Sequence, residues 1–262
     1  MMIVAAYLLL GAVAGLIAGV FGLGGGIVIV PTLIFTFTYL SFDPAILTHL
    51  AIGTSLTTIL FTSLSAIYVH HKKAAINWPL AIKLSFGMFI GGFIGAYTAN
   101  LISGVILQNV FAAYAFFVAI QMWFSFTPKA TYVLPKAFGC SLLGVFVGAC
   151  SGLFGIAGGS IMVPVLTFYK VNIAKAVATA SVTGFPIALS AAIGYLWLGI
   201  DVQNLPEHSF GYIYWPALLG IIITSTYFAK VGAKLAHGLN PNVLKKAFSL
   251  LMVGVAIKLF LS

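Results

Sequence analysis

Hydrophobic residues fill this chain in long runs, separated by short polar or glycine-rich breaks. A helix needs about 20 mainly apolar residues to cross the hydrocarbon core of a membrane, so the longer runs predict membrane-spanning helices. The predicted segments are 3–22, 27–40, 45–69, 79–100, 104–125, 134–155, 160–169, 172–198, 213–235 and 242–261. Segments 27–40 and 160–169 are short for a crossing, and the pattern leaves open whether they span or turn back.

The composition agrees with lipid as the main solvent. The 262 residues are 62% hydrophobic and 6% charged, with a mean hydropathy of +1.16. A soluble domain carries about 25% charged residues, so ordinary soluble enzymes are excluded. The first segment lacks a basic start and its pattern recurs in mid-chain, which argues against a signal peptide. We therefore predict an all-α polytopic membrane protein with roughly eight to ten membrane segments.

The chain contains an internal duplication. When it is shifted by 133 positions, ten of the 23 residues in 11–33 are identical to those in 144–166. Residues 1–126 and 130–262 are accordingly predicted to be two copies of one unit within a single transmembrane domain. Duplication of this kind is typical of secondary transporters.

The lysines indicate how the two copies are oriented. If each glycine-rich break separates two segments, each half holds five, and ten lysines fall on one side of the membrane. Asp43, Asp201 and Glu207 then fall on the other side. Because positive loops stay in the cytoplasm, the termini are predicted to lie outside. An odd number of segments makes the halves inverted repeats, and re-entrant hairpins in place of the short segments give the same charge distribution.

Two glycine-rich breaks carry the predicted binding site, formed by Gly24, Gly25 and Gly26 in the first half and by Gly158, Gly159 and Ser160 in the second. A helix that restarts inside the membrane presents free N–H groups and a positive dipole end, which attract anions. Inverted repeats would bring two such helix starts to face each other near the midplane. The alternative is close helix packing, which is also how the preceding glycine stripes at 11, 15 and 19 and at 144, 148 and 152 are interpreted.

Hydroxyl groups and one histidine complete the candidate site. Ser55 and Thr57 align with Ser181 and Thr183, and all four could donate to anion oxygens without carrying charge. The alternative is that they bond to backbone carbonyls, as membrane serines and threonines commonly do. His49 is a candidate proton relay, although its place near a helix end would also let it reach the interface.

Other chemistries find little support in the sequence. The two cysteines form no CxxC motif and no phosphate-binding loop is present, so we expect no cofactor and no metal. All twelve basic residues are lysine and no basic stripe alternates with aromatic residues, so the charge of +9 indicates topology and not a nucleic-acid partner. An intramembrane enzyme would need acids, a nucleophile pair or a metal cluster, and the three acids lie in predicted outer loops. We predict that the protein is not an enzyme.

The two breaks have similar sequences, GLGGGIVIVP at 22–31 and GIAGGSIMVP at 155–164. Over its whole length the chain resembles the sulfite exporter TauE/SafE family, also called the TSUP permeases, although Ala157 stands where the first half has Gly24. The resemblance implies a multi-pass permease of the bacterial inner membrane that moves sulfite, thiosulfate, an organosulfonate or a related anion. With the inverted halves it suggests alternating access. A permease for another anion or small solute and an intramembrane enzyme remain the alternatives. The anion, the direction, the coupling ion and the oligomeric state stay open at this point.

Overall fold

The computed structural model describes residues 2–21, 25–124, 134–236 and 241–261, and ten helices account for most of them. The first half contains α1 (Met2–Phe21), α2 (Gly26–Tyr39), α3 (Leu47–Lys72), α4 (Trp78–Asn100) and α5 (Gly104–Trp123). The second half contains α6 (Ala137–Phe154), α7 (Gly159–Phe168), α8 (Ile173–Leu198), α9 (Trp215–Ala236) and α10 (Pro241–Leu261). A hairpin of β1 (Ser209–Phe210) and β2 (Ile213–Tyr214) precedes α9. All ten predicted segments are confirmed as helices.

The helices that follow the glycine-rich breaks are too short to cross a membrane. Helix α2 has 14 residues and α7 has 10. At about 1.5 Å of rise per residue they extend roughly 21 Å and 15 Å, whereas the hydrocarbon core is about 30 Å thick. Helices α3, α4, α5, α6 and α8 are long and apolar enough to cross it. The protein is thus a multi-pass, all-α membrane protein, and α2 and α7 are each too short to cross the hydrocarbon core alone.

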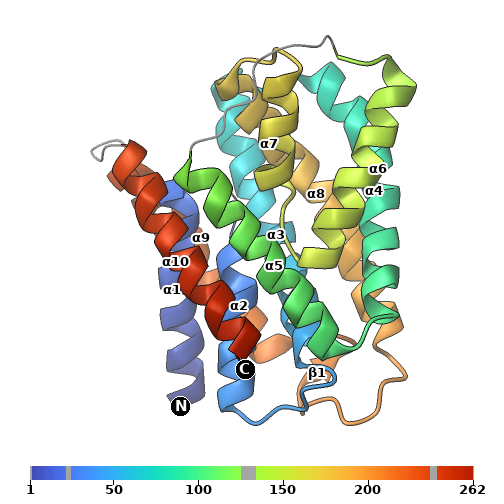
Figure 1. Cartoon of the computed structure of the whole chain (residues 1–262), viewed down its shortest axis with the longest axis vertical. Coiled ribbons are helices and arrows are strands. Elements are labelled where there is room, and N and C mark those ends of the chain that lie inside the picture. Colours follow the sequence, from blue (N-terminus) through green and yellow to red (C-terminus); the bar gives the residue numbers. More distant parts are fainter. Residues whose placement is uncertain (1, 22–24, 125–133, 237–240, 262) are drawn as a thin grey trace.

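Apart from the glycine-rich break between α6 and α7, the described connections between helices lie at two opposite ends of the bundle (Figure 1). Segments 40–46, 101–103 and 199–214 lie at the end where α1 begins and α10 finishes. This end holds the three acidic residues of the chain. Segments 73–77 and 169–172 lie at the opposite end and contain lysines. Figure 1 also shows α1 running away from the acidic end and α6 running towards it.

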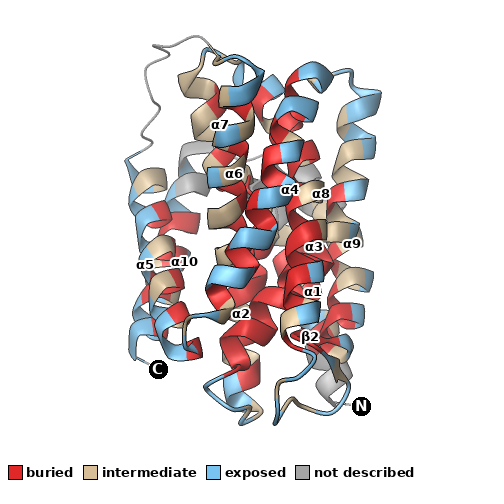
Figure 2. Ribbon diagram, turned by 90° about the vertical axis from the view of Figure 1, so that its right-hand side faces the viewer, coloured by how far each residue is buried: buried red, intermediate tan, exposed pale blue. Residues whose placement is uncertain are grey.

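Equivalent helices of the two halves have equivalent packing partners. Helix α1 packs along α9, and α6 packs along α4, with each pair in contact over much of its length. Helix α3 packs on α8, and α5 on α10, so these two contacts each join counterparts. In Figure 2 the buried positions concentrate on α2 and α3 at the centre of the bundle.

The long interfaces depend on small residues, as the packing interpretation of the glycine stripes predicted. A methyl group added at Gly148 would come within 2.6 Å of the Met88 carbonyl oxygen in α4, and one at Gly91 would overlap the carbonyl of Val145 in α6. Gly15 of α1 lies equally close to Ser225 of α9. Close backbone approach of this kind drives helix association in lipid, where there is no hydrophobic force between helices.

Candidate functional site

The second glycine-rich break is a short loop between α6 and α7. Gly155 ends α6 with a φ of +69°, and its successor Ile156 donates its N–H to the Ser151 carbonyl at 3.1 Å. Gly158 then precedes α7 with a φ of +73°. Left-handed backbone of this kind is strained for residues with a Cβ, so two glycines let the chain turn within the membrane region. The predicted interruption of the helix at this position is confirmed.

The carbonyl oxygens at the end of α6 are already hydrogen-bonded. The Ser55 hydroxyl of α3 donates to the Gly155 carbonyl at 2.9 Å. The Tyr195 hydroxyl of α8 donates to the Gly152 carbonyl at 3.3 Å. Together with the bond from Ile156, these contacts satisfy much of the negative end of α6. Ser55 therefore lies at the break, where it bonds to a backbone carbonyl as in the alternative interpretation, and its part in binding a substrate stays a prediction.

At the start of α7, in contrast, two backbone N–H groups lack hydrogen-bond acceptors among the described residues. The Gly158 carbonyl accepts the N–H groups of Ile161 and Met162, at 3.1 and 2.7 Å. Among the described residues, the N–H groups of Gly159 and Ser160 have no acceptor. The first N–H groups of a helix have no partner inside the helix, and the positive end of its dipole lies with them. The break as a whole thus presents hydrogen-bond donors.

Two hydroxyl groups that the sequence did not single out lie at the same place. The Tyr114 hydroxyl of α5 is 2.8 Å from Ser160 Oγ, and its ring stacks on Phe154 with 4.3 Å between centroids. Ser151 is fully buried, and its Oγ has no hydrogen-bond partner among the described residues. A methyl group at Gly158 would lie 3.1 Å from this oxygen. Ser151 stands one helical turn before the break, a signal that sequence reasoning could have used, whereas Tyr114 lies on a distant helix.

The first break lies against the second. Gly24 falls outside the described residues, and Gly25 caps α2 by accepting the N–H groups of Val28 and Ile29 at 3.1 and 2.9 Å. Gly26 is buried against the Gly155 carbonyl, so closely that a side chain there would overlap it. The start of α2 therefore packs against the end of α6 and the loop that follows it, and the facing of the two helix starts stays a prediction.

Three of the predicted hydroxyl residues bond within their own helices. Thr57 donates to the Gly53 carbonyl, Ser181 to the Val177 carbonyl and Thr183 to the Ala180 carbonyl, at 2.8 to 3.0 Å. This is the pattern of the alternative interpretation, in which membrane hydroxyls satisfy the backbone. Their part in binding a substrate stays a prediction.

His49 lies near the start of α3 and is 3% exposed. Its Nε2 is 3.0 Å from the Ala99 carbonyl oxygen of α4, and its ring stacks on Tyr212 with 5.1 Å between centroids. Its Nδ1 has no partner among the described residues. His49 thus packs between α4 and the hairpin, and the proton relay stays a prediction.

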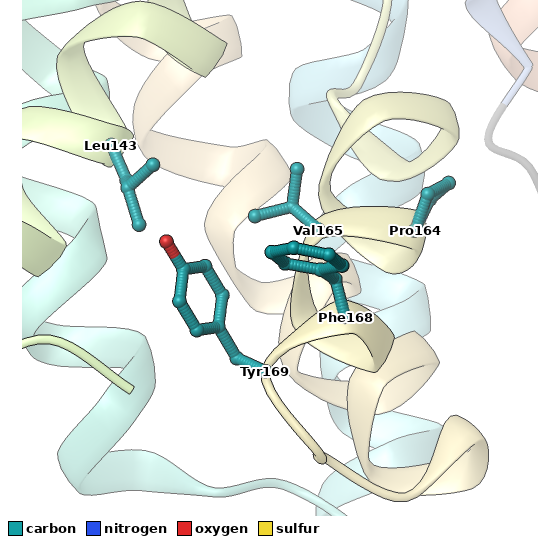
Figure 3. A pocket seen from close by; sticks show the side chains of 5 residues that line it. All are labelled: Leu143, Pro164, Val165, Phe168 and Tyr169. Carbon is teal, nitrogen blue, oxygen red and sulfur yellow. The ribbon is translucent and has the colours of Figure 1, made fainter. Parts of the chain in front are cut away.

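A separate hollow lies between α6 and α7. It has a volume of about 290 Å³ and is lined by Leu143, Pro164, Val165, Phe168 and Tyr169. Figure 3 shows the Tyr169 hydroxyl pointing towards Leu143, with hydrocarbon groups around it. Such a lining cannot replace the hydrogen bonds that an oxyanion makes with water, so this hollow does not suit an anion.

Comparison with known proteins places the chain among membrane transporters. The sequence model of the family described as sulfite exporter TauE/SafE matches residues 7–259. A protein of Haemophilus influenzae named "Probable membrane transporter protein" is 35% identical, and the alignment covers 97% of each chain. A similarly named protein of Methanocaldococcus jannaschii is 30% identical over 91% of this chain and 88% of its own. The protein YunE of Bacillus subtilis, also named a probable membrane transporter, is 25% identical over 95% and 94% of the two chains. No solved structure matches this chain.

Proposed function

Because the chain belongs to the sulfite exporter TauE/SafE family, we propose that this membrane transporter carries a small sulfur-containing anion. Sulfite, thiosulfate and an organosulfonate are the candidate substrates. The substrate is held where the broken helices meet, and transport proceeds by alternating access between the two halves.

The observation that carries the anion assignment is the unequal hydrogen bonding at the α6–α7 break. Ser55 and Tyr195 occupy carbonyl oxygens there, while the N–H groups of Gly159 and Ser160 have no acceptor among the described residues. A cation would need those carbonyl oxygens, and an anion needs the N–H groups. The remaining donors therefore favour a negatively charged substrate.

Alternating access is supported by the relation between the halves. The α1–α9 and α4–α6 contacts exchange with each other when residues 1–126 and 130–262 are interchanged, and the α3–α8 and α5–α10 contacts map onto themselves. The opposite directions of α1 and α6 in Figure 1 fit inverted repeats. In such transporters, one repeat rocks against the other around a fixed site near the midplane.

The charge distribution supports a location in the bacterial inner membrane with the lysine-bearing end in the cytoplasm. The acidic connections and both termini then lie outside. In this orientation, an inside-negative potential would drive an anion outward, by about 2.3 kcal/mol per charge at 100 mV.

The assignment can be tested by flux measurements on purified protein in liposomes. We expect uptake of sulfite or methanesulfonate that exceeds uptake by empty liposomes and responds to an imposed membrane potential. Acetate serves as an oxyanion without sulfur, and a potassium salt of an impermeant anion tests for cation movement. Flux of acetate alone would reassign the substrate to a different anion, and flux of cations alone would contradict the donor-lined site.

A further inference from the structure

We propose that the start of α7 forms a single binding position for a monovalent oxyanion, held by the N–H groups of Gly159 and Ser160 and by the hydroxyls of Ser151 and Tyr114. This inference rests on the proposed function and specifies where the anion sits and which charge state it has.

Ser151 supplies the first indication of a missing ligand. Its side chain is fully buried, yet its Oγ has no partner among the described residues. Leaving a buried hydroxyl without a partner is unfavourable, so a buried group of this kind indicates a missing binding partner. The oxygen lies beside Gly158, the residue directly before the free N–H groups of α7. An anion at the start of α7 would accept a hydrogen bond from the Ser151 hydroxyl.

Tyr114 and Ser160 supply a further donor. Their hydroxyl oxygens are 2.8 Å apart, and the pair contains two hydrogens of which their mutual bond uses one. The second hydrogen is available to an acceptor outside the pair. Stacking on Phe154 restrains the Tyr114 ring, and this holds the hydroxyl in place at the start of α7.

The positions that correspond to these three residues in the other half of the chain carry no hydroxyl. With the offset of 133, Ser151 and Ser160 align with Ala18 and Ile27, and with the offset of 137 Tyr114 aligns with Leu251. The first turn of α2 is buried among apolar groups, and Gly26 packs directly on Gly155. The two helix starts are therefore unequal: the binding position lies at the start of α7, whereas the start of α2 packs against the loop between α6 and α7.

The charge of the ligand follows from the absence of cations at this position. Among the described residues, no lysine or histidine bonds to Ser151, Tyr114 or Ser160. A helix start contributes roughly half a positive charge. The cost of removing an ion from water rises with the square of its charge, so uncharged donors and one helix start favour a monoanion over a dianion. A sulfonate, or sulfite carrying one proton, fits this requirement better than sulfate.

The test measures binding of methanesulfonate and of sulfate to the purified full-length protein by isothermal titration calorimetry. Ser151→Ala removes one donor, and the double variant Tyr114→Phe with Ser160→Ala removes the donor of the hydroxyl pair while keeping the ring that stacks on Phe154. Matched controls are Ser225→Ala, at a buried serine whose hydroxyl also has no partner among the described residues, and Tyr212→Phe, whose hydroxyl bonds to Asn100. We expect wild-type protein to prefer methanesulfonate, and each site variant to weaken its binding by about tenfold or more, because a hydrogen bond to a charged group is lost.

Separate outcomes would overturn separate claims. Sulfate binding as tight as methanesulfonate binding would refute the preference for a monoanion. Unchanged affinity in the site variants, or equal losses in the two controls, would refute the location. Absence of any anion binding or flux in the wild-type protein would instead refute the proposed function, irrespective of the variants.

Discussion

Glycine serves two distinct purposes in this chain. Gly91 and Gly148 lie within regular helices. Glycine is needed there because the backbone of the neighbouring helix lies where a side chain would be. Gly155 and Gly158 are needed because their φ angles are positive, at +69° and +73°. The first purpose builds the interface between α4 and α6, and the second opens the break that presents the N–H groups of α7.

Replacing Gly158 tests the second purpose. We expect Gly158→Ala to lower the stability of the protein, since a left-handed conformation costs a residue with a Cβ roughly 1–2 kcal/mol. The new methyl group would also lie 2.8 Å from Cδ1 of Ile187. Gly254→Ala is the matched control because no atom of the described residues lies within 4 Å of its added methyl group, and helix propensity there favours alanine by about 1 kcal/mol. Thermal unfolding in detergent should separate the two variants in opposite directions.

His49 can be tested by a substitution that keeps its hydrogen bond. Glutamine can still donate an N–H to the Ala99 carbonyl but cannot take up a proton near neutral pH. If His49 relays protons, His49→Gln should abolish the response of flux to an imposed pH gradient while the unfolding temperature changes little. If flux through the His49→Gln variant responds to the gradient as flux through the wild-type protein does, His49 has only a packing role between α4 and Tyr212.

At the scale of elements, the hairpin of β1 and β2 distinguishes the two halves. The connection 199–214 is longer than its counterpart 73–77 and folds into the bundle. The N–H groups of Tyr212 and Tyr214 donate to the Tyr195 carbonyl at 3.2 Å and to Thr54 Oγ1 at 3.0 Å. Backbone from the acidic end is thereby fixed to α3 and α8, the two central helices that also supply Ser55 and Tyr195 to the break.

Thr54 is the residue that most directly tests this attachment. Thr54→Val removes the acceptor of the Tyr214 N–H and leaves it buried, which should cost about 1–3 kcal/mol of stability. Thr58→Val is the matched control, because Thr58 is equally buried and, within the described part of the chain, donates only to the Thr54 carbonyl in its own helix. Thermal unfolding should show the larger loss for Thr54→Val. Equal losses would mean that the hairpin bond contributes no more than an intrahelical one.

At the scale of the whole molecule, charge is separated between the two ends of the bundle. The connections at one end contain the acidic residues, and those at the other contain lysines (Figure 1). Exposed aromatic and aliphatic side chains such as Phe86, Phe117 and Phe138 cover the outer helix faces between the two ends. A surface of this kind suits lipid along the sides and water at the ends.

The orientation of these ends can be measured by cysteine labelling in intact cells. In a background with Cys140 and Cys150 replaced, Gln203→Cys should react with a membrane-impermeant maleimide, because its connection is proposed to face outward. Lys73→Cys should react only after permeabilisation. Both positions are exposed, so access through protein does not limit either reaction. Reaction of both in intact cells, or of Lys73→Cys alone, would contradict the proposed topology.

The sequence alone predicted the membrane class, the ten helices, the helix break before Gly158 and the packing role of the glycine stripes. These properties depend on the hydropathy of single segments and on the spacing of glycines along them, and both can be read within the length of one helix. It also grouped Ser55 with Ser181 as candidate site residues, because the two recur in the duplicated halves, and that role stays a prediction.

Only the tertiary structure decided which groups meet at the break. Tyr114 and Ser160 are 46 positions apart, and Ser55 and Gly155 are 100 apart, so no local pattern could pair them. The structure likewise left Ser151 without a partner, while Thr57, Ser181 and Thr183 bond within their own helices. Whether a hydroxyl donates to its own helix or to a distant group depends on which backbone packs beside it, and that is a property of the folded bundle.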